Sequence, residues 1–435
     1  MSKKSLSIVS LLTCFVLLAG SCMALAADYD FGGRTVVFAG MNMTPPPEGS
    51  PYYDAWKAAE EEFNVKIEFR KIDAGQIVDT IMAAVLAGDP TIDIVQTDSG
   101  SYAPLVTRGA LRPIGHLLPD EYWESIPEPL QGRAGFKESR TILGQCYGLP
   151  MSFGDYIVVQ VIGWNKDMFE REGLPSLYDL VESGEWTWEK MREIAAALTA
   201  DTDGDGQIDR YGVGGMFPNH SPQNTLLPVL ATNGVEMTRV VDGKVVFDLD
   251  AGGKASTVLD YVRQMTVFDK SVDLAGWNHA QYLNEKVGMY VVPLWANDGL
   301  ARDAEFETGV VPMPKGPDAT DYTMSVSSIT QVCIPVSSDE DTEALIALWN
   351  AYNQPDLVWD DVNSRVSAAR DQESYDLLMR CITDWELFSP YTGALNNQNF
   401  WFPMGEFTSG RRTAAEVIAE TTPAVQAALD DLLGQ

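Results

Sequence analysis

Histidine is nearly absent from this chain of 435 residues, and the motifs of common hydrolases and nucleotide-binding enzymes are missing. The three histidines, His116, His220 and His279, do not form the short sequence pairs that metal sites use. Neither a Gly-x-Ser-x-Gly elbow nor a glycine-rich phosphate loop occurs. The sequence therefore offers no distinctive catalytic segment, although its 62 acidic residues leave a paired-acid glycosidase open.

Cysteine and basic residues are also scarce. After the N-terminal segment only Cys146, Cys333 and Cys381 remain, which allows one disulfide at most and lacks the close spacing of zinc or redox sites. Lys and Arg number 30 against 62 Asp and Glu, so the formal net charge is −32. This negative charge disfavours nucleic acid and anionic membrane surfaces as partners and favours solubility.

Long apolar runs are missing except at the N-terminus, where the pattern is that of an export signal. Lys3 and Lys4 precede a mostly apolar run, Leu6–Leu18, and Ala24–Ala26 offers small residues for cleavage. The run is too short and too often interrupted by Ser and Thr for a membrane span of about 20 residues. We expect residues 1–27 to be a signal peptide.

A second interpretation of the same segment is a lipoprotein signal, in which Cys22 becomes the lipidated N-terminus. Either interpretation predicts export to the periplasm or the outer face of the cytoplasmic membrane. No later segment is long and apolar enough to span a bilayer, so the mature chain is expected to be soluble.

The mature sequence alternates between strand and helix patterns. The apolar spacing predicts strands at 35–39, 65–70 and 92–95, with helices at 53–63 and 77–86 between them. Repeated strand-helix-strand units predict a mostly parallel sheet in an α/β fold. Ligands of such sheets bind at the carboxyl ends of the strands.

The length of the mature chain exceeds what one hydrophobic core usually organises, which predicts two large domains. Pro150–Gly154 has the composition of a crossing segment, and a second α/β region follows it. We place residues 28–150 and about 308–352 in a first lobe, and residues 151–307 and about 353–435 in a second.

The most specific local motif is an acidic loop with oxygen-bearing side chains or carbonyls at alternate positions around glycines, as calcium loops are built. The position that should carry a bidentate Glu is Gly212, so a distant carboxylate or water would have to complete the site. The alternative is a solvated acidic turn without metal. The expected ligands of a structural calcium ion are Asp201, Asp203, Asp205, Gln207 and Asp209.

Eleven tryptophans are present, several of them among amides. Trp277 lies beside Asn278, Trp295 is close to Asn297, and Trp401 follows a run of Asn and Gln. Aromatic faces can pack on the C–H faces of sugar rings while amides bond the hydroxyl groups. These positions therefore favour a neutral carbohydrate as ligand, although a tryptophan is more often part of a core.

Eight short segments follow one another in a characteristic order along nearly the whole mature chain. They are Leu86–Pro90 with Asp93–Val95, Tyr147–Pro150 with Trp164–Phe169, Gly184–Trp188, Asn284–Tyr290 ending in Trp295, Val311–Pro314, and Ser409–Glu416. In this order the segments resemble the carbohydrate-binding family of extracellular solute-binding proteins of ABC importers, which includes maltose-binding protein. Trp164 and Gly288 depart from the pattern of that family.

The resemblance implies a type II periplasmic-binding-protein-like fold, in which two α/β lobes close like a hinge on a ligand in the cleft between them. Only Trp295 matches a family motif residue, a stacking tryptophan; the other implied contacts are carried over by position. They are Asn42, Asp98, Tyr156, His220, Asn397 and Trp401.

The resulting prediction is a monomeric binding protein that delivers a small molecule, most simply a sugar, to the permease subunits of an ABC transporter. Two alternatives remain open. A secreted carbohydrate-active enzyme would also suit the tryptophans and acids, and a solute-sensing receptor subunit would use the same lobes.

Overall fold

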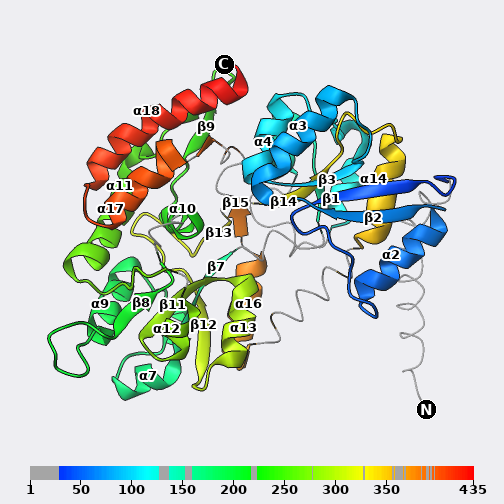
Figure 1. The fold of residues 1–435 in the computed structure, drawn as a ribbon. Coiled ribbons are helices and arrows are strands. Elements are labelled where there is room, and N and C mark those ends of the chain that lie inside the picture. Colours follow the sequence, from blue (N-terminus) through cyan, green and yellow to red (C-terminus); the bar gives the residue numbers. More distant parts are fainter. Residues whose placement is uncertain are drawn as a thin grey trace, which may run out of the picture.

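The computed structural model describes residues 29–126, 137–151, 159–216, 223–276, 278–326, 329–354, 357, 366, 369–383, 385–387, 391, 394–395 and 397–435. Two α/β lobes lie side by side, each built on its own sheet (Figure 1). The predicted signal segment, residues 1–27 with Cys22, lies outside the described residues. Within the described part of the chain, no helix is long and apolar enough to cross a membrane.

The first lobe has a five-stranded sheet in the order β2-β1-β3-β14-β6. The first three strands are parallel, whereas β14 runs antiparallel to both β3 and β6. The strands are β1 (Thr35–Gly40), β2 (Lys66–Lys71), β3 (Ile94–Asp98), β6 (Leu149–Pro150) and β14 (Thr330–Cys333). The covering helices are α2 (Pro51–Glu62), α3 (Ile77–Ala87), α4 (Ser99–Thr107) and α14 (Thr342–Tyr352).

Strand β1 is buried on both faces, which explains its unbroken apolar run. Val36 and Phe38 enter a core that includes residues of α2 and α14. Val37 and Ala39 point to the opposite face and pack with residues of α3 and α4. Successive strand residues alternate between the two faces of the sheet. One set of alternate residues in β1 therefore packs against α2 and α14, and the other set packs against α3 and α4.

The second lobe has a four-stranded sheet in the order β12-β7-β11-β8. Strand β7 is antiparallel to β12 and β11, and β11 is parallel to β8. The strands are β7 (Gln160–Asn165), β8 (Tyr211–Gly214), β11 (Val287–Pro293) and β12 (Thr308–Pro312). The longer surrounding helices are α9 (Trp188–Leu198), α10 (Gln223–Ala231), α11 (Lys254–Arg263), α13 (Leu294–Asp303), α16 (Gln372–Thr383) and α18 (Ala414–Leu433).

Shorter elements complete the lobes. In the first they are α5 (Asp120–Glu124) and the pair β4 (Thr141–Ile142) and β5 (Gln145–Cys146). In the second they are α7 (Lys166–Arg171), α8 (Leu177–Glu182), α12 (His279–Leu283), α17 (Phe402–Thr408), the hairpin β9 (Thr238–Val241) and β10 (Lys244–Phe247), and the π-helical turns Gln264–Phe268 and Asn397–Trp401. Strands β13 (Met324–Val326) and β15 (Trp385–Leu387) pair between the lobes (Figure 1).

The two-lobed α/β fold predicted from the sequence is confirmed, but the expected return to the first lobe near residue 308 is wrong. Strand β12 pairs with β7 from Thr308 to Pro312 and so belongs to the second sheet. The first sheet is rejoined only at β14. The reason is that an apolar run such as Val310–Pro312 is buried equally well in either sheet, and its composition does not specify which.

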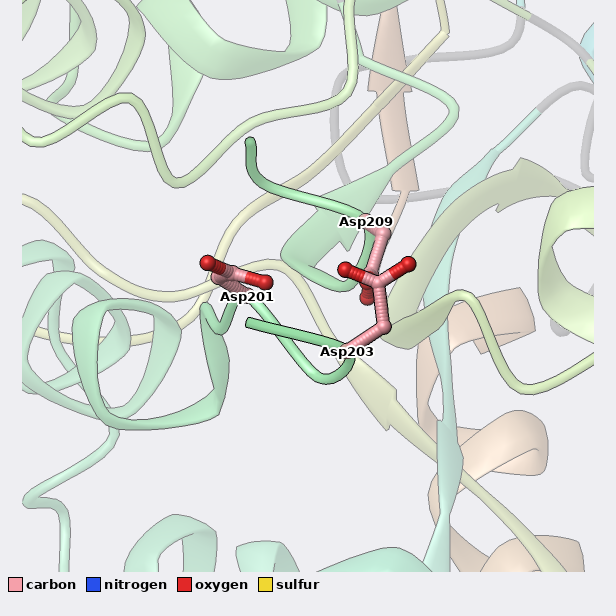
Figure 2. A group of neighbouring side chains, drawn as sticks. All are labelled: Asp201, Asp203 and Asp209. Carbon is pink, nitrogen blue, oxygen red and sulfur yellow. The ribbon is translucent and has the colours of Figure 1, made fainter. Parts of the chain in front are cut away.

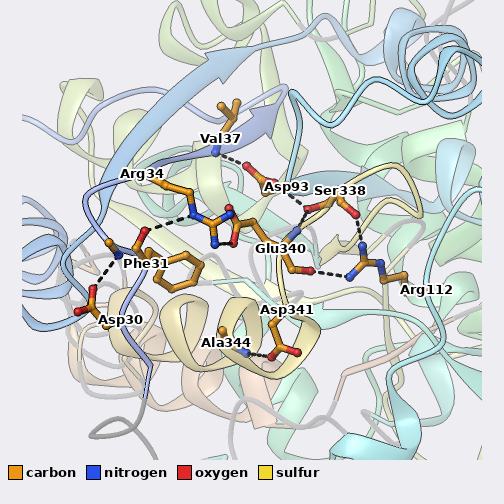
Figure 3. A network of polar contacts seen from close by, with 11 residues as sticks. Asp30, Phe31, Arg34, Val37, Asp93, Arg112, Ser338, Glu340, Asp341 and Ala344 are labelled. Atoms are coloured by element: carbon orange, nitrogen blue, oxygen red, sulfur yellow. Dashed lines mark hydrogen bonds and ion pairs between the residues drawn. The ribbon is translucent and has the colours of Figure 1, made fainter.

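A buried carboxylate fastens the chain after β14 to the first sheet (Figure 3). Asp93 accepts hydrogen bonds from the Val37 N–H at 2.9 Å and from Ser338 Oγ at 2.7 Å. Nearby, Arg34 pairs with Glu340 at 2.6 Å. Burial raises the pKa of Asp93 and of Glu340, since desolvation disfavours their charged forms.

Replacing Asp93 with alanine should lower the free energy of unfolding by about 2 to 4 kcal/mol, because the Val37 and Ser338 donors would be left buried without an acceptor. Asp93→Asn should cost much less, since the amide oxygen can accept from Val37 and the amide NH₂ can donate to Ser338 Oγ. Urea unfolding of the three proteins at pH 7 checks both statements.

The same variants carry a pH signature. Because the folded-state pKa of Asp93 lies above its ordinary value of 3.8, the folded protein binds this proton first as the pH falls. The wild type should therefore gain stability relative to Asp93→Asn between neutral pH and about pH 4, and no further below it. A constant difference between the two proteins across that range would contradict this role.

Candidate functional site: two strand edges and an acidic loop

The first candidate surface lies at one edge of the first sheet. Because β1 and β3 are adjacent and parallel, their carboxyl ends meet at this edge, which brings together the loops that bear Asn42 and Asp98. Asn42 is exposed, and its backbone N–H donates to Gln96 Oε1 at 2.8 Å. The buried Gln96 thereby fixes the loop that follows β1.

Asp98 has a local structural role that its sequence position did not reveal. It is the N-cap of α4, where its Oδ1 accepts from the Ser101 N–H at 2.9 Å and its own N–H donates to Ser101 Oγ at 3.0 Å, which makes a capping box. The residue is half-buried. One carboxylate oxygen is thus used to begin the helix, and a contact with ligand remains a prediction.

The second candidate surface is the corresponding edge of the second sheet. Strands β8 and β11 are parallel neighbours, so their carboxyl ends also meet. Trp295 follows β11 as the second residue of α13 and is 43% exposed. By contrast, Trp186 and Trp188 are fully buried and donate their indole N–H groups to Pro312 O and Thr232 Oγ1. Trp295 therefore offers an accessible aromatic surface at this edge.

The remaining predicted contacts are not brought together by the described residues. Trp401 is half-buried, its ring centroid lies 4.6 Å from that of Phe400, and its Nε1 donates to Leu395 O at 3.1 Å. Asn397 begins the π-helical turn that ends at Trp401, but its side chain lies outside the described residues. Tyr156, His220 and Trp277 also lie outside the described residues.

Two glutamines at the edge of the first sheet were not predicted. Gln96 supports the Asn42 loop, and Gln331 on β14 lies in register with Thr97 beside it. Gln331 is fully buried, and neither polar atom of its side-chain amide has a hydrogen-bond partner among the residues that the structure describes. A glutamine inside an otherwise apolar strand is unusual, because burying an amide costs free energy, and that pattern could have singled out both residues.

The acidic loop between α9 and β8 gathers three carboxylates (Figure 2). One oxygen from each of Asp201, Asp203 and Asp209 lies within 4.8 Å of the other two. Asp201 accepts from the backbone N–H groups of Gly204 at 2.6 Å and Gly206 at 2.7 Å. These bonds wrap the backbone around the carboxylate and lower the pKa of Asp201, which keeps it charged.

Hydrogen bonds also stabilise the closing end of the loop. Thr202 donates from Oγ1 to Asp209 Oδ1 at 2.6 Å and from its N–H to Oδ2 at 3.1 Å, and these bonds lower the pKa of Asp209. A bridge between Ala200 and Arg210 closes the loop at its base. The loop is thus a defined turn with three converging negative charges.

Of the other two expected ligands, Asp205 is not among the three grouped carboxylates, although its N–H donates to Asp203 Oδ1 at 3.1 Å. Asp205 accepts from the Gln207 N–H at 2.8 Å and from Gln207 Nε2 at 3.1 Å, and both side chains are exposed. Position 212 cannot hold a metal-coordinating glutamate in place of Gly212, because a Cβ there would lie 2.2 Å from Ala195 O. Three carboxylate oxygens at this spacing suit a hard divalent cation whose coordination water completes.

The two α/β lobes thus carry candidate residues at the carboxyl edges of their sheets, where ligands of open α/β sheets bind. The family model for bacterial extracellular solute-binding proteins matches residues 44–359. The chain belongs to this family. The family is one of binding proteins outside the cytoplasm, which agrees with the resemblance found in the sequence. Comparison with curated proteins gives no match.

Solved structures with the same fold cover nearly all of this chain. A sugar transporter of Rhizobium etli in an open conformation is 17% identical, covers 90% of this chain and 99% of its own, and has a TM-score of 0.65. The GacH receptor of Streptomyces glaucescens, studied unliganded and with acarbose, is 17% identical over 93% and 99%, with a TM-score of 0.63. The maltodextrin-binding domain MalE of Bdellovibrio bacteriovorus, bound to maltotriose, is 14% identical over 92% and 100%, with a TM-score of 0.61.

Proposed function

We propose that this protein captures a neutral carbohydrate between its two lobes and delivers it to the membrane permease of an ABC importer. The observation that carries the proposal is Trp295, an exposed indole at the carboxyl edge of the second sheet. An indole face can stack on a sugar ring. The sugar ligands of similarly folded proteins, acarbose and maltotriose among them, support the same class.

The mechanism is hinge closure. A ligand that contacts the loop at Asn42 in the first lobe and Trp295 in the second binds the closed arrangement more tightly than the open one. It therefore shifts the population towards closure by that difference in affinity. The permease then distinguishes loaded from empty protein by the closed surface. The protein acts by binding alone, as a monomer, and carries out no chemical step.

A thermal-shift screen of residues 28–435 tests the proposal. Saccharides, polyols, amino acids and short peptides are compared in the presence of calcium. A ligand at a hundredfold excess over its dissociation constant stabilises by about 2.7 kcal/mol, which the method detects. A shift confined to saccharides supports the proposal, whereas a shift with charged amino acids alone would replace the ligand class. Release of the chromophore from a chromogenic glycoside would instead favour the alternative function, a secreted carbohydrate-active enzyme.

For localisation, we propose that residues 1–27 direct export and are removed, which places the protein in the periplasm or on the outer face of the cytoplasmic membrane. Lipid attachment at Cys22 is the competing outcome. The mass of the mature N-terminal peptide distinguishes the two, because cleavage after residue 27 gives an unmodified peptide and the lipoprotein route gives an acylated Cys22.

We also propose that the acidic loop holds a structural calcium ion through Asp201, Asp203 and Asp209, with Asp205 and Gln207 adding contacts when the ion is present. The ion would neutralise the converging carboxylates and hold the junction between α9 and β8. Its role is to stabilise the second lobe, not to contact the ligand.

Chelation of calcium should lower the melting temperature of the wild type by about 5 to 10 °C, since removal of a ligand at a hundredfold excess costs about 2.7 kcal/mol. Asp203→Asn should melt at the chelated temperature whether or not calcium is added. The matched control is Asp242→Asn in the β9–β10 turn, where Asn tolerates the positive φ of 51°. If chelation leaves the wild type unchanged, the loop is an empty acidic turn.

A further inference from the structure

Arg370 lies where the chain, having left α14 of the first lobe, rejoins the second lobe before α16. Its Nη1 donates to Phe306 O at 2.7 Å and its Nη2 to Ala304 O at 2.7 Å. Ala304 is the C-cap of α13. Carbonyl groups at a helix C-terminus lack intrahelical donors, and a cation there also interacts favourably with the helix dipole. Arg370 therefore holds the carboxyl end of α13.

The opposite end of this helix presents Trp295. The helix has ten residues and is roughly 15 Å long, short enough to move as a rigid unit. Leu300 and Ala301 on its inner face are buried in the second lobe. Any shift of the helix at the Arg370 end is consequently transmitted to the indole at the other end.

The residues that follow Arg370 are fixed to the second lobe. Asp371 Oδ2 accepts from Lys166 Nζ at 2.8 Å and from the Tyr178 hydroxyl at 3.0 Å. Ser374 Oγ accepts from the Val310 N–H at 3.1 Å. These bonds join the start of α16 to α7, α8 and β12. The backbone next to Arg370 is therefore held in place within the second lobe.

The first-lobe side of the same connection is also anchored. Pro150 O, where the chain first leaves the first lobe, accepts from Trp349 Nε1 at 2.8 Å and from Asn353 Nδ2 at 3.3 Å. The end of α14 is thus bonded to the other crossing point.

We propose that Arg370 is a positioning residue for ligand binding, which fixes the orientation of α13 and thereby places Trp295 against its ligand. The inference rests on the proposed function, since that function assigns Trp295 to the ligand. Arg370 acts through α13 and does not itself contact the ligand.

The test compares Arg370→Gln and Arg370→Lys with the control Arg239→Gln. Arg239 forms an exposed ion pair with Asp248 on the β9–β10 hairpin, away from α13. With maltotriose as the probe, Arg370→Gln should weaken binding about tenfold, within the range of energetic coupling between distant residues. Arg370→Lys, which keeps the charge and part of the bonding, should be intermediate. The control should bind as the wild type does, and all melting temperatures should lie within a few degrees.

Hydrogen exchange without sugar is the second readout. In Arg370→Gln, amides of residues 294–303 should exchange several times faster than in the wild type, while the rest of the lobe is unchanged. Unchanged exchange in α13 overturns the inference whether or not maltotriose binds. Weaker binding with exchange raised throughout the second lobe also overturns it, since that is general destabilisation.

The two proposals fail in distinguishable ways. If the wild type binds maltotriose and Arg370→Gln binds it equally well, the positioning role is wrong and the proposed function stands. If the wild type does not bind maltotriose but exchange in α13 rises in Arg370→Gln, the link between Arg370 and the helix stands, and the proposed ligand is what failed.

Discussion

Replacing Trp295 with alanine should weaken carbohydrate binding by about thirtyfold or more while the protein remains folded. Removal of a central aromatic contact costs 2 kcal/mol or more in well-packed sites, and each 1.4 kcal/mol is tenfold in affinity. The fold should tolerate the change because the side chain is 43% exposed and is not part of either lobe's buried core. Titration calorimetry measures the affinity, and a melting curve checks the fold.

The controls for this variant separate stacking from exposure. Trp295→Phe keeps a smaller aromatic face and should bind with intermediate affinity. Phe268→Ala removes an aromatic side chain that is 62% exposed elsewhere on the second lobe, and it should leave binding unchanged. Undiminished affinity in Trp295→Ala would eliminate the site assigned to this edge of the sheet.

Replacing Gly212 with alanine should destabilise the second lobe by about 3 kcal/mol or more. A Cβ at this position would lie 2.2 Å from Ala195 O and 2.3 Å from Ala195 Cα, which are backbone atoms of α9. No side-chain rotation can relieve that contact, so the helix and β8 would have to separate, and overpacking of this kind is costly. A urea unfolding curve measures the loss.

Gly75 provides the matched control, because an added Cβ there would have no atom of the described residues within 4 Å. Gly75→Ala should leave the unfolding curve almost unchanged. If Gly212→Ala unfolds at the same urea concentration as Gly75→Ala, then α9 and β8 are not packed backbone to backbone. The explanation that close packing against Ala195 excludes a glutamate at position 212 of the acidic loop would then also be wrong.

The three parallel strands of the first sheet were predictable from the sequence, because β1 is a nearly continuous apolar run and β2 alternates apolar with charged residues. Thr35–Gly40 was expected to within one residue, and the strand at Ile94–Asp98 was placed two to three residues too early. The error at β3 arises at Gln96 and Thr97, which are polar but buried, so the apolar run ends before the strand does. A sequence pattern records the polarity of a residue and not its partners.

The assignment of strands to sheets was less predictable. β12 was expected in the first lobe and pairs with β7 in the second, since register and partner depend on contacts distant in sequence. Position in the chain did place Asn42 after a strand whose carboxyl end shares an edge with its parallel neighbour, whereas Trp295 came from the family resemblance, and a ligand contact of either residue stays a prediction. Chain position alone had further limits. It could not show that Asp98 caps a helix or that Trp401 donates its indole N–H to Leu395.

Titration calorimetry of the mature wild-type protein with neutral oligosaccharides, beginning with maltotriose, tests the central claim most directly. The account predicts saturable binding of one sugar per chain, at micromolar concentration or below, that Trp295→Ala removes. Absence of heat with every neutral saccharide, together with saturable binding of a charged solute, would contradict it.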